Sequence, residues 1–458
     1  MQELTVSHAA LGANYTPRRG WFHTWGEIEP AQIQEDLAQI ADLGLDHVRI
    51  FPLWPVLQPN RTLISSRAVD DVLTVVDLAG EQGLDISVDL LQGHLSSYDF
   101  LPAWISTWHR RNMFTDPNVV DAQKQLARVL GGELAERSHV TGMTLGNEIG
   151  QFAVSYHPDP HPVTSEEATA WTRDLLETVD QHLPGRRSHH SFDDTLWFKD
   201  DHPFTPADAV TLGASTTVHS WVFTGAGQTF GEGHPALALY GRYLIEVADL
   251  WRRHLGAPAD RRIWLQEIGA PTPWVDAEHA PQFADTSIRS AVAHPAVEAV
   301  TWWCSHDVSR DLGDFPEVEY SLGLFDEHGR TKPIGEAIGA LAAELRAEHG
   351  GGGVGERAEP PFAEQFLAEQ PVGAQPDAAR PFAEQPVAEL SVPDLARDGS
   401  DRSVLGPRGE IFARWVAEAL EGRPCRLVTA ADEARTEEAI DHNASPSAPI
   451  NLRRAARR

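Results

Sequence analysis

Two glutamates that follow strand-like segments are the residues of this chain best suited to chemistry. Glu148 lies in the stretch GMTLGNEIG (142–150) and Glu267 in IWLQEIG (263–269). In both stretches an apolar run ends at a carboxylate beside glycine, which lets the backbone turn and leaves the side chain at the strand tip. Two carboxyls at strand tips that share one pocket could perform acid/base chemistry.

Hydrolysis of a glycosidic bond with retention needs such a pair. One carboxyl protonates the leaving oxygen and the other, about 5–5.5 Å away, attacks the anomeric carbon. Glu148 and Glu267 are far apart in the sequence, so only a fold can bring them together. The competing interpretation is that each is a solvated loop carboxylate. Polar residues at several other strand ends favour a shared site.

These further candidates are Arg49, His94, Asn147 and His219, each at or just after the end of a strand-like segment. A buried arginine needs a partner, and a carboxylate nucleophile would supply one. Many of the 14 tryptophans precede or follow expected strands. Sugars stack on flat aromatic faces, so tryptophans in loops suit a carbohydrate site, although burial in the core is the alternative.

The elements that must position these residues alternate between strand and helix. The expected strands are 11–15, 47–51, 86–91, 140–145, 189–192, 214–218, 263–265 and 299–303. The expected helices are 30–43, 69–82, 118–136, 164–182, 236–254, 281–293 and 333–348; residues 164–167 (TSEE) have the capping-box spacing. Eight repeats over about 350 residues predict an α/β fold, a (β/α)8 TIM barrel, whose active site lies at the carboxyl ends of the strands. A doubly wound sheet is the alternative, but no Gly-x-Gly-x-x-Gly turn follows the first strand.

The composition changes at Gly350, where a run of four glycines begins. We therefore expect a catalytic domain at 1–349, a disordered linker rich in Ala, Pro and Glu at 350–407, and a tail at 408–458. One amphipathic helix is expected within that tail, at 410–420. We expect the tail to have no catalytic role.

The net charge of −30 disfavours nucleic acid and anionic membranes as partners. No apolar run approaches the roughly 18 residues of a membrane span, and no secretory signal is visible, so we expect a cytoplasmic protein. Cys304 and Cys425 are expected to be free thiols. The histidines include no HExxH pattern, and we expect neither a metal nor a cofactor. The sequence indicates no oligomeric state.

Together these residues resemble the clan A glycoside hydrolases, specifically family 5. The resemblance rests on Asn147-Glu148 after the fourth strand, Glu267 after the seventh, and Arg49, His94 and Trp303 on the second, third and eighth. It implies that Glu148 is the acid/base, Glu267 the nucleophile, Asn147 a donor to the sugar 2-hydroxyl, and Arg49 the residue that orients Glu267. It also implies that His94 and His219 bind the reacting sugar and that Trp303 forms the floor beneath it, with Trp302 as the alternative.

One position departs from the family pattern. Family members commonly have a tyrosine two residues after the sixth-strand histidine, where it touches the nucleophile, but Trp221 stands there in this chain. We place Trp221 at the substrate site and expect some other group to tune Glu267. We also expect a raised pKa for Glu148 and an ionised Glu267 beside Arg49.

Three loop stretches resemble an actinobacterial and bifidobacterial branch of family 5 that is associated with β-mannosides. They are GANYTPRRGWF (12–22), FPLWP (51–55) and HLSSYDFLP (94–102). The resemblance implies a retaining β-mannosidase, including action on the mannose–N-acetylglucosamine linkage. The missing secretory signal and long inserts at 150–235 favour an exo-β-mannosidase that acts on short oligosaccharides. The alternatives are an endo-β-mannanase or β-glucanase, a catalytically silent carbohydrate-binding barrel, and a metal-dependent amidohydrolase-type barrel.

Overall fold

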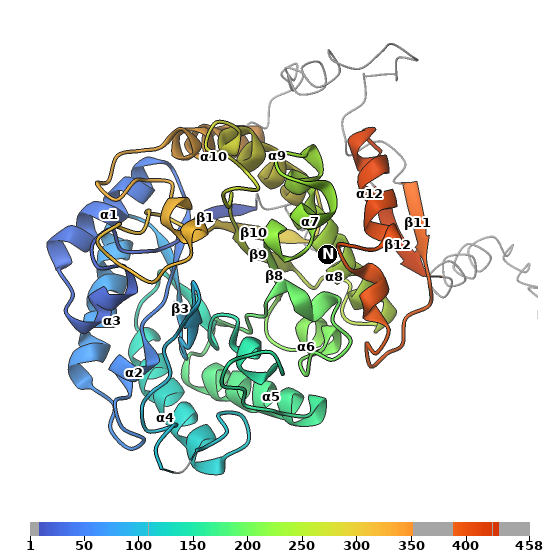
Figure 1. Cartoon of the computed structure of the whole chain (residues 1–458). Helices are drawn as coiled ribbons and strands as arrows, with labels where there is room; N and C mark the ends of the chain where they lie inside the picture. Colours follow the sequence, from blue (N-terminus) through green and yellow to red (C-terminus); the bar gives the residue numbers. More distant parts are fainter. Residues whose placement is uncertain (1–8, 109, 351–387, 424, 430–458) are drawn as a thin grey trace, which may run out of the picture.

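The structure, a computed structural model, describes residues 9–108, 110–350, 388–423 and 425–429. Eight parallel strands form one sheet in the order β7-β6-β3-β2-β1-β10-β9-β8, and helices surround it (Figure 1). The strands are β1 (Ala10–Asn14), β2 (His47–Ile50), β3 (Asp85–Asp89), β6 (Val140–Thr144), β7 (Arg187–His189), β8 (Thr216–Ser220), β9 (Ile263–Ile268) and β10 (Val297–Trp302). The end strands β7 and β8 meet where the Ala214 N–H donates to the Ser188 carbonyl at 2.8 Å. The predicted (β/α)8 barrel is confirmed.

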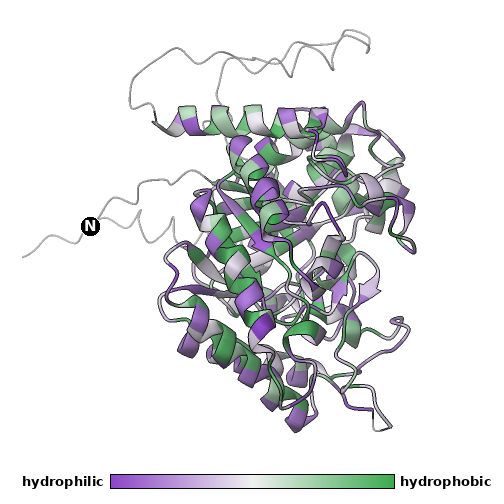
Figure 2. Ribbon diagram, turned by 90° about the vertical axis from the view of Figure 1, so that its left-hand side faces the viewer, coloured by the Kyte–Doolittle hydropathy of each residue, from purple (hydrophilic) through white to green (hydrophobic). Residues whose placement is uncertain are grey.

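The longer helices follow the strands as the periodicity predicts, whereas the short helices α2, α6 and α7 were not predicted. They are α1 (Pro30–Asp42), α2 (Trp54–Leu57), α3 (Ser66–Glu81), α4 (Pro117–Leu134), α5 (Ser165–His182), α6 (Pro206–Thr211), α7 (Ala226–Phe230), α8 (Tyr240–His254), α9 (Ala280–Val292) and α10 (Pro333–Gly350). The predicted capping box opens α5: Thr164 Oγ1 accepts from the Glu167 N–H, and Glu167 accepts from the Thr164 N–H. The surrounding helices carry both hydrophobic and hydrophilic residues (Figure 2), as expected for elements that cover a barrel.

Short elements after the strands shape the open end of the barrel. Six of them matter for the site: the hairpin strands β4 (His94–Leu95) and β5 (Tyr98–Asp99), and the 3-10 helices η2 (Ile149–Ala153), η3 (Asp194–Trp197), η4 (Val222–Thr224) and η6 (Glu317–Ser321). Two further 3-10 helices of the barrel are η1 (Trp21–Gly26) and η5 (Pro235–Leu239). The sequence periodicity did not predict these elements, because each is too short to show a repeating pattern.

The interior of the barrel is packed with side chains, including polar ones that bond to one another. Thr301 Oγ1 accepts from Trp264 Nε1 and lies 2.7 Å from His47 Nε2. Gly12 on β1 makes room for His47, because a Cβ at position 12 would lie 2.4 Å from that imidazole ring. This layer fixes the strands beneath the site.

The segment 388–429 differs from the expectation for a linker and tail. Residues 388–405, which we expected to be disordered, contain strand β11 (Ala388–Val392) and the 3-10 helix η8 (Arg402–Leu405). The predicted helix is confirmed as α12 (Glu410–Leu420), and strand β12 (Cys425–Thr429) pairs in parallel with β11. Low-complexity composition did not predict the order of this segment, because Leu390, Val392 and Leu395 are buried in the same hydrophobic cluster as side chains of the barrel. The remainder of the expected linker, 351–387, and of the tail, 430–458, lies outside the described residues.

Within the described residues, no helix is long and apolar enough to cross a membrane. Cys304 and Cys425 are both free and buried. Burial raises the pKa of the Cys304 thiol, so it has the character of a structural residue rather than a nucleophile.

Candidate active site

A pocket of about 910 Å³ opens at the carboxyl ends of the barrel strands. Six of the residues proposed from the sequence line it: His94, Asn147, Glu148, Trp221, Glu267 and Trp303. They come from loops and strand ends that are distant in the chain, and parallel strands in a closed barrel bring those ends together. The pocket therefore gathers most of the predicted site.

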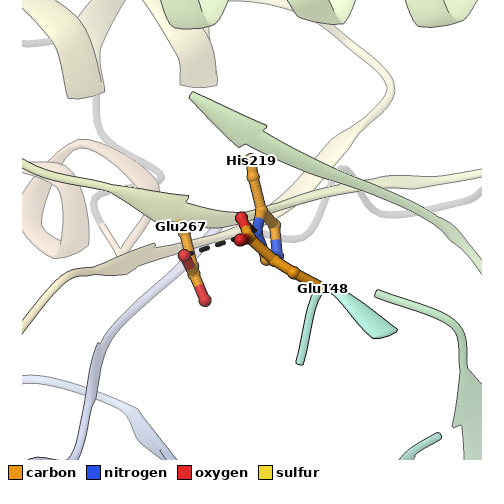
Figure 3. Close-up of side chains that lie close together, drawn as sticks. All are labelled: Glu148, His219 and Glu267. Atoms are coloured by element: carbon orange, nitrogen blue, oxygen red, sulfur yellow. Dashed lines mark hydrogen bonds and ion pairs between the residues drawn. The ribbon is translucent and has the colours of Figure 1, made fainter. Parts of the chain in front are cut away.

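Glu148, His219 and Glu267 lie at the base of this pocket and point toward one another (Figure 3). One oxygen of each glutamate and one ring nitrogen of the histidine all lie within 4.8 Å of one another. His219 Nδ1 is 2.8 Å from Glu148 Oε1 and 3.3 Å from Glu267 Oε2. The two carboxyls thus have the proximity that a retaining glycosidase requires.

The backbone around Glu148 is unusual. Glu148 has a φ of 44°, in the left-handed region that non-glycine residues rarely adopt. Two residues earlier, a Cβ at Gly146 would lie 2.3 Å from the Leu91 carbonyl oxygen, so glycine permits the close approach of the two chains. Strained backbone of this kind is common where a side chain must be aimed at a site.

Two donors hold the carboxylate of Glu267. Arg49 Nη1 donates to Glu267 Oε1 at 3.1 Å, and Trp221 Nε1 donates to Glu267 Oε2 at 3.2 Å. His219 Nδ1, which bonds to Glu148, lies 3.3 Å from Glu267 Oε2. The expectation that some other group must replace the usual tyrosine was wrong, because the indole N–H of Trp221 reaches the carboxylate of Glu267 itself.

Arg49 is buried and does not line the pocket. Its guanidinium forms a two-pronged ion pair with Asp89, with distances of 2.9 and 2.8 Å, and also donates to Asn147 Oδ1 at 2.7 Å. The planar guanidinium therefore links two strand ends to Glu267. Asp89 ends the third strand, so the strand-end pattern that selected Arg49 could also have found its partner.

Burial raises the pKa of Glu267; His219 and Arg49 lower it, and the charge of Glu148 raises it. Arg49 favours the ionised form of Glu267, as we expected, but the net shift of this pKa is upward. Burial lowers the pKa of His219, but Glu267 and Glu148 outweigh that effect and raise it.

His94 and Asn147 lie beside the carboxyl pair. His94 Nδ1 is 3.0 Å from Asp99 Oδ1 across the β4–β5 hairpin, and Asn147 Nδ2 donates to the His94 carbonyl at 3.3 Å. Burial lowers the pKa of His94, but Asp99 and Glu148 raise it by more. Asn147 uses its oxygen on Arg49 and one amide hydrogen on His94, which leaves its second hydrogen for a ligand.

Two adjacent tryptophans, Trp302 at the end of β10 and Trp303 directly after it, have different surroundings. Trp303 lines the pocket and makes an edge contact with Trp221, with ring centroids 6.4 Å apart. Trp302, our alternative for the floor, is buried and donates from Nε1 to the Leu322 carbonyl. Successive side chains of a strand point to opposite faces, so only one of the two can reach the site.

Several residues in and beneath the pocket were not proposed from the sequence. Gln151 lines the pocket and donates to Glu148, and Gln266, which is buried, accepts at 3.1 Å from His219 Nε2. Glu319, on η6, places a further carboxyl in the pocket; burial and repulsion from Glu267 and Glu148 raise its pKa to about 7. Glu319 and Gln151 lie in 3-10 helices too short to show a periodic pattern, so sequence patterns could not select them.

Glu148, His219 and Glu267 are also the group best placed to hold a metal ion among the described residues. The arrangement suits proton chemistry better. Arg49 already neutralises Glu267, and a second cation beside that guanidinium would be repelled.

No protein-family model matches the chain, and no curated protein matches its sequence. Solved structures do match. A GH5_18 enzyme from Streptomyces cattleya, in complex with Manβ1-4GlcNAc, is 43% identical, with a TM-score of 0.81 over 95% of this chain and 98% of that one. A GH5_18 enzyme from Bifidobacterium longum, also in complex with Manβ1-4GlcNAc, is 37% identical, with a TM-score of 0.82 over 98% and 99%.

An exo-β-1,4-mannosidase from an Opitutaceae bacterium shares the fold at 21% identity, with a TM-score of 0.71 over 92% of this chain and 70% of that one. The identities to the GH5_18 enzymes extend over nearly the whole of both chains. The resemblance stated from the strand-end residues is confirmed, and the amidohydrolase alternative is set aside. The chain belongs to subfamily 18 of glycoside hydrolase family 5 and is an O-glycosyl hydrolase.

Proposed function

We propose that the protein is a retaining exo-β-mannosidase that releases mannose from short β-linked oligosaccharides, including mannose-β-1,4-N-acetylglucosamine. The observation that carries this proposal is the meeting of Glu148 and Glu267 in one pocket, each held by its own set of donors. The complexes of two GH5_18 relatives with Manβ1-4GlcNAc support the choice of sugar.

The surroundings of the two glutamates distinguish their roles. Glu267 is 2% exposed and accepts hydrogen bonds from Arg49 and Trp221, which suits a nucleophile that must stay fixed. Glu148 is 8% exposed, on a turn at the pocket wall, which suits a group that exchanges protons with water.

In the first step, a Glu267 oxygen forms a bond to the anomeric carbon while the bond to the leaving oxygen breaks. The leaving oxygen keeps the electron pair and takes the proton of Glu148. In the second step, Glu148 removes a proton from water, and the water oxygen attacks the same carbon and releases Glu267. His219 holds both carboxyls in place, and the free amide hydrogen of Asn147 would bond to the sugar 2-hydroxyl.

Exo action is supported by the walls of the pocket. The tip of the β4–β5 hairpin, Ser96-Ser97, lines it together with Glu319, which hydrogen-bonds to Ser96, and Trp303 lines it as well. Both serines have positive φ values, 48° and 71°, which hold the tip in a tight turn. We infer that these walls leave no room for a second sugar on the non-reducing side of the reacting mannose.

The proposal is tested with a substrate panel. Nitrophenyl β-mannoside, mannobiose and the mannose–N-acetylglucosamine disaccharide should be hydrolysed, and the matching β-glucoside and β-galactoside far more slowly. NMR of the first-formed sugar should show β-mannose; α-mannose would disprove retention. Activity on polymeric mannan equal to that on mannobiose would instead favour the endo-mannanase alternative.

A further inference from the structure

The segment 388–429 packs against the barrel as part of its fold. The rings of Phe412 and Trp415 on α12 lie 4.6 and 5.4 Å from the ring of Tyr243 on α8. Trp415 is buried and donates from Nε1 to the Cys425 carbonyl at 2.8 Å. Figure 1 places α12 and the β11–β12 pair outside the barrel, on the side of α8. The segment is therefore held by a core of its own against that helix.

Between β11 and α12 the chain returns to the pocket. Arg402, which is buried, donates to the carbonyls of Lys199 at 2.7 Å and His202 at 2.8 Å. The hydroxyl of Tyr243 donates to the Leu405 carbonyl at 2.8 Å. These bonds fix the start of the stretch 403–409, which we call the lip.

The lip forms part of the pocket wall. Ser403, Gly406, Pro407, Arg408 and Gly409 all line the pocket. Pro407 packs on the turn before α7. Its carbonyl accepts from Thr229 Oγ1, within that helix, at 2.9 Å. The lip therefore closes a side of the site that the barrel loops alone would leave open.

Contacts between the lip and the segment that follows Glu148 support a place for the lip on the leaving-group side. The acid/base must face the leaving oxygen, so that group lies on the Glu148 side of the reacting sugar. Tyr156, a few residues after Glu148, lines the pocket, and Lys199 Nζ lies 4.0 Å from the centroid of its ring. The Lys199 carbonyl in turn accepts from Arg402, which precedes the lip.

Arg408 is the cationic side chain of the lip. It is exposed, and it donates to the neutral amide of Gln228, which also lines the pocket. A guanidinium has five N–H donors, so most remain for a ligand. Its neutral partner leaves the positive charge available to strengthen a bond to a sugar oxygen.

We propose that the lip forms the binding site for the leaving-group sugar and that Arg408, held by Gln228, donates hydrogen bonds to it. The acceptors that fit are hydroxyl oxygens and the carbonyl oxygen of an N-acetyl group. This inference rests on the proposed β-mannosidase function and adds to it the residue that selects the sugar next to mannose.

The test compares two substrates with different leaving groups. For Arg408→Ala, kcat/KM on the mannose–N-acetylglucosamine disaccharide should fall about 10- to 100-fold, because a charge-assisted bond is lost. On nitrophenyl β-mannoside it should fall by about threefold or less, because that leaving group lacks the sugar's hydroxyl and N-acetyl acceptors. Inhibition by free N-acetylglucosamine should weaken as much as the disaccharide reaction. Arg414→Ala is the matched control, an exposed arginine on α12 that does not line the pocket, and should change neither rate.

A second variant moves the lip without touching Arg408. A Cβ at Gly225 would lie 2.4 Å from Pro407 Cγ, so Gly225→Ala should displace the lip and raise KM for the disaccharide more than for the aryl mannoside. Equal losses on both substrates, or no loss on either, in Arg408→Ala would overturn the inference. A wild-type enzyme that hydrolyses neither substrate would instead overturn the proposed function.

Discussion

The base and the outer wall of the pocket are built in different ways. At the base, Arg49, His219 and Glu267 stand on strands and are buried, and the first two each pair with Glu267. The outer wall comes from loops and from the lip, where Arg408 and Gln228 are exposed. A rigid base suits bond cleavage, which tolerates little misplacement. Residues of the outer wall can vary without disturbing the base of the pocket, so selection of the leaving group is separable from bond cleavage.

The largest effect should follow loss of the acid/base. Glu148→Ala should lower kcat on the disaccharide by about 10⁴-fold or more, because its leaving group must be protonated. With a dinitrophenyl mannoside, whose leaving group needs no proton, the rate of the first step should fall far less. Azide should restore turnover of that substrate and yield β-mannosyl azide. Formation of α-mannosyl azide, or no rescue at all, would contradict the role of Glu148.

Substitution at Arg49 should damage both activity and stability. Arg49→Lys cannot keep the two-pronged bond to Asp89 and the bond to Glu267 together, so we expect kcat to fall by about 10²-fold and unfolding to become about 3 kcal/mol easier. Activity assays and chemical denaturation measure the two effects. Arg187→Lys is the control, since its pair with Glu298 is half-exposed and should contribute about 1 kcal/mol or less. Equal effects of the two substitutions would show that the base of the pocket is not specially organised.

The indole of Trp221 should have a smaller effect, visible in the pH profile. Trp221→Phe removes the donor to Glu267, and that bond lowers the pKa of the carboxyl. The pKa of Glu267 should therefore rise, and the acidic limb of kcat/KM should move to higher pH, with about a 10-fold loss of kcat. Trp104→Phe also loses an indole hydrogen bond, to the Gln58 carbonyl, but lies outside the pocket lining and should leave the limb in place. An unmoved limb in Trp221→Phe would mean that the tyrosine of other family members has no counterpart here.

The smallest expected effect concerns Glu319, on the wall of the pocket. Its pKa is raised to about 7 from an ordinary value of 4.5, so the folded protein loses stability as the pH rises between these values. Glu319→Gln should therefore raise Tm by about 2–4 °C at pH 8 and leave it unchanged near pH 4.5. Glu317→Gln, two residues away and paired with Arg310, should not raise Tm at either pH. A pH-independent change in Glu319→Gln would show that the carboxyl is not perturbed.

The base of the site could be predicted from the sequence because barrel geometry converts strand ends into neighbours. Each of Arg49, His219 and Glu267 stood at the end of an apolar run, so the fold prediction also placed the residues. The choice between Trp302 and Trp303 could not be made, because it depends on which face of one strand turns inward. The contact of Trp221 with Glu267 was missed for a similar reason, since it depends on side-chain reach rather than on residue type.

The outer wall could not be predicted. The lip stands in a stretch that composition marked as a linker, and its order depends on Phe412 and Trp415 meeting Tyr243, a contact between distant parts of the chain. The helix that carries these aromatic residues was predicted, but its docking site was not. Glu319 likewise lies in a 3-10 helix too short to show periodicity, and only the fold brings it near Glu148 and Glu267.

The central claim is that Glu267 forms a bond to the substrate while Glu148 transfers protons. The most direct test is to incubate the protein with a 2-deoxy-2-fluoro-β-mannosyl fluoride, digest it, and locate the labelled residue by mass spectrometry. We predict one label, on Glu267, with activity lost in proportion to labelling. A label on Glu148, Glu319 or another residue, or complete inactivation without a covalent adduct, would contradict the mechanism.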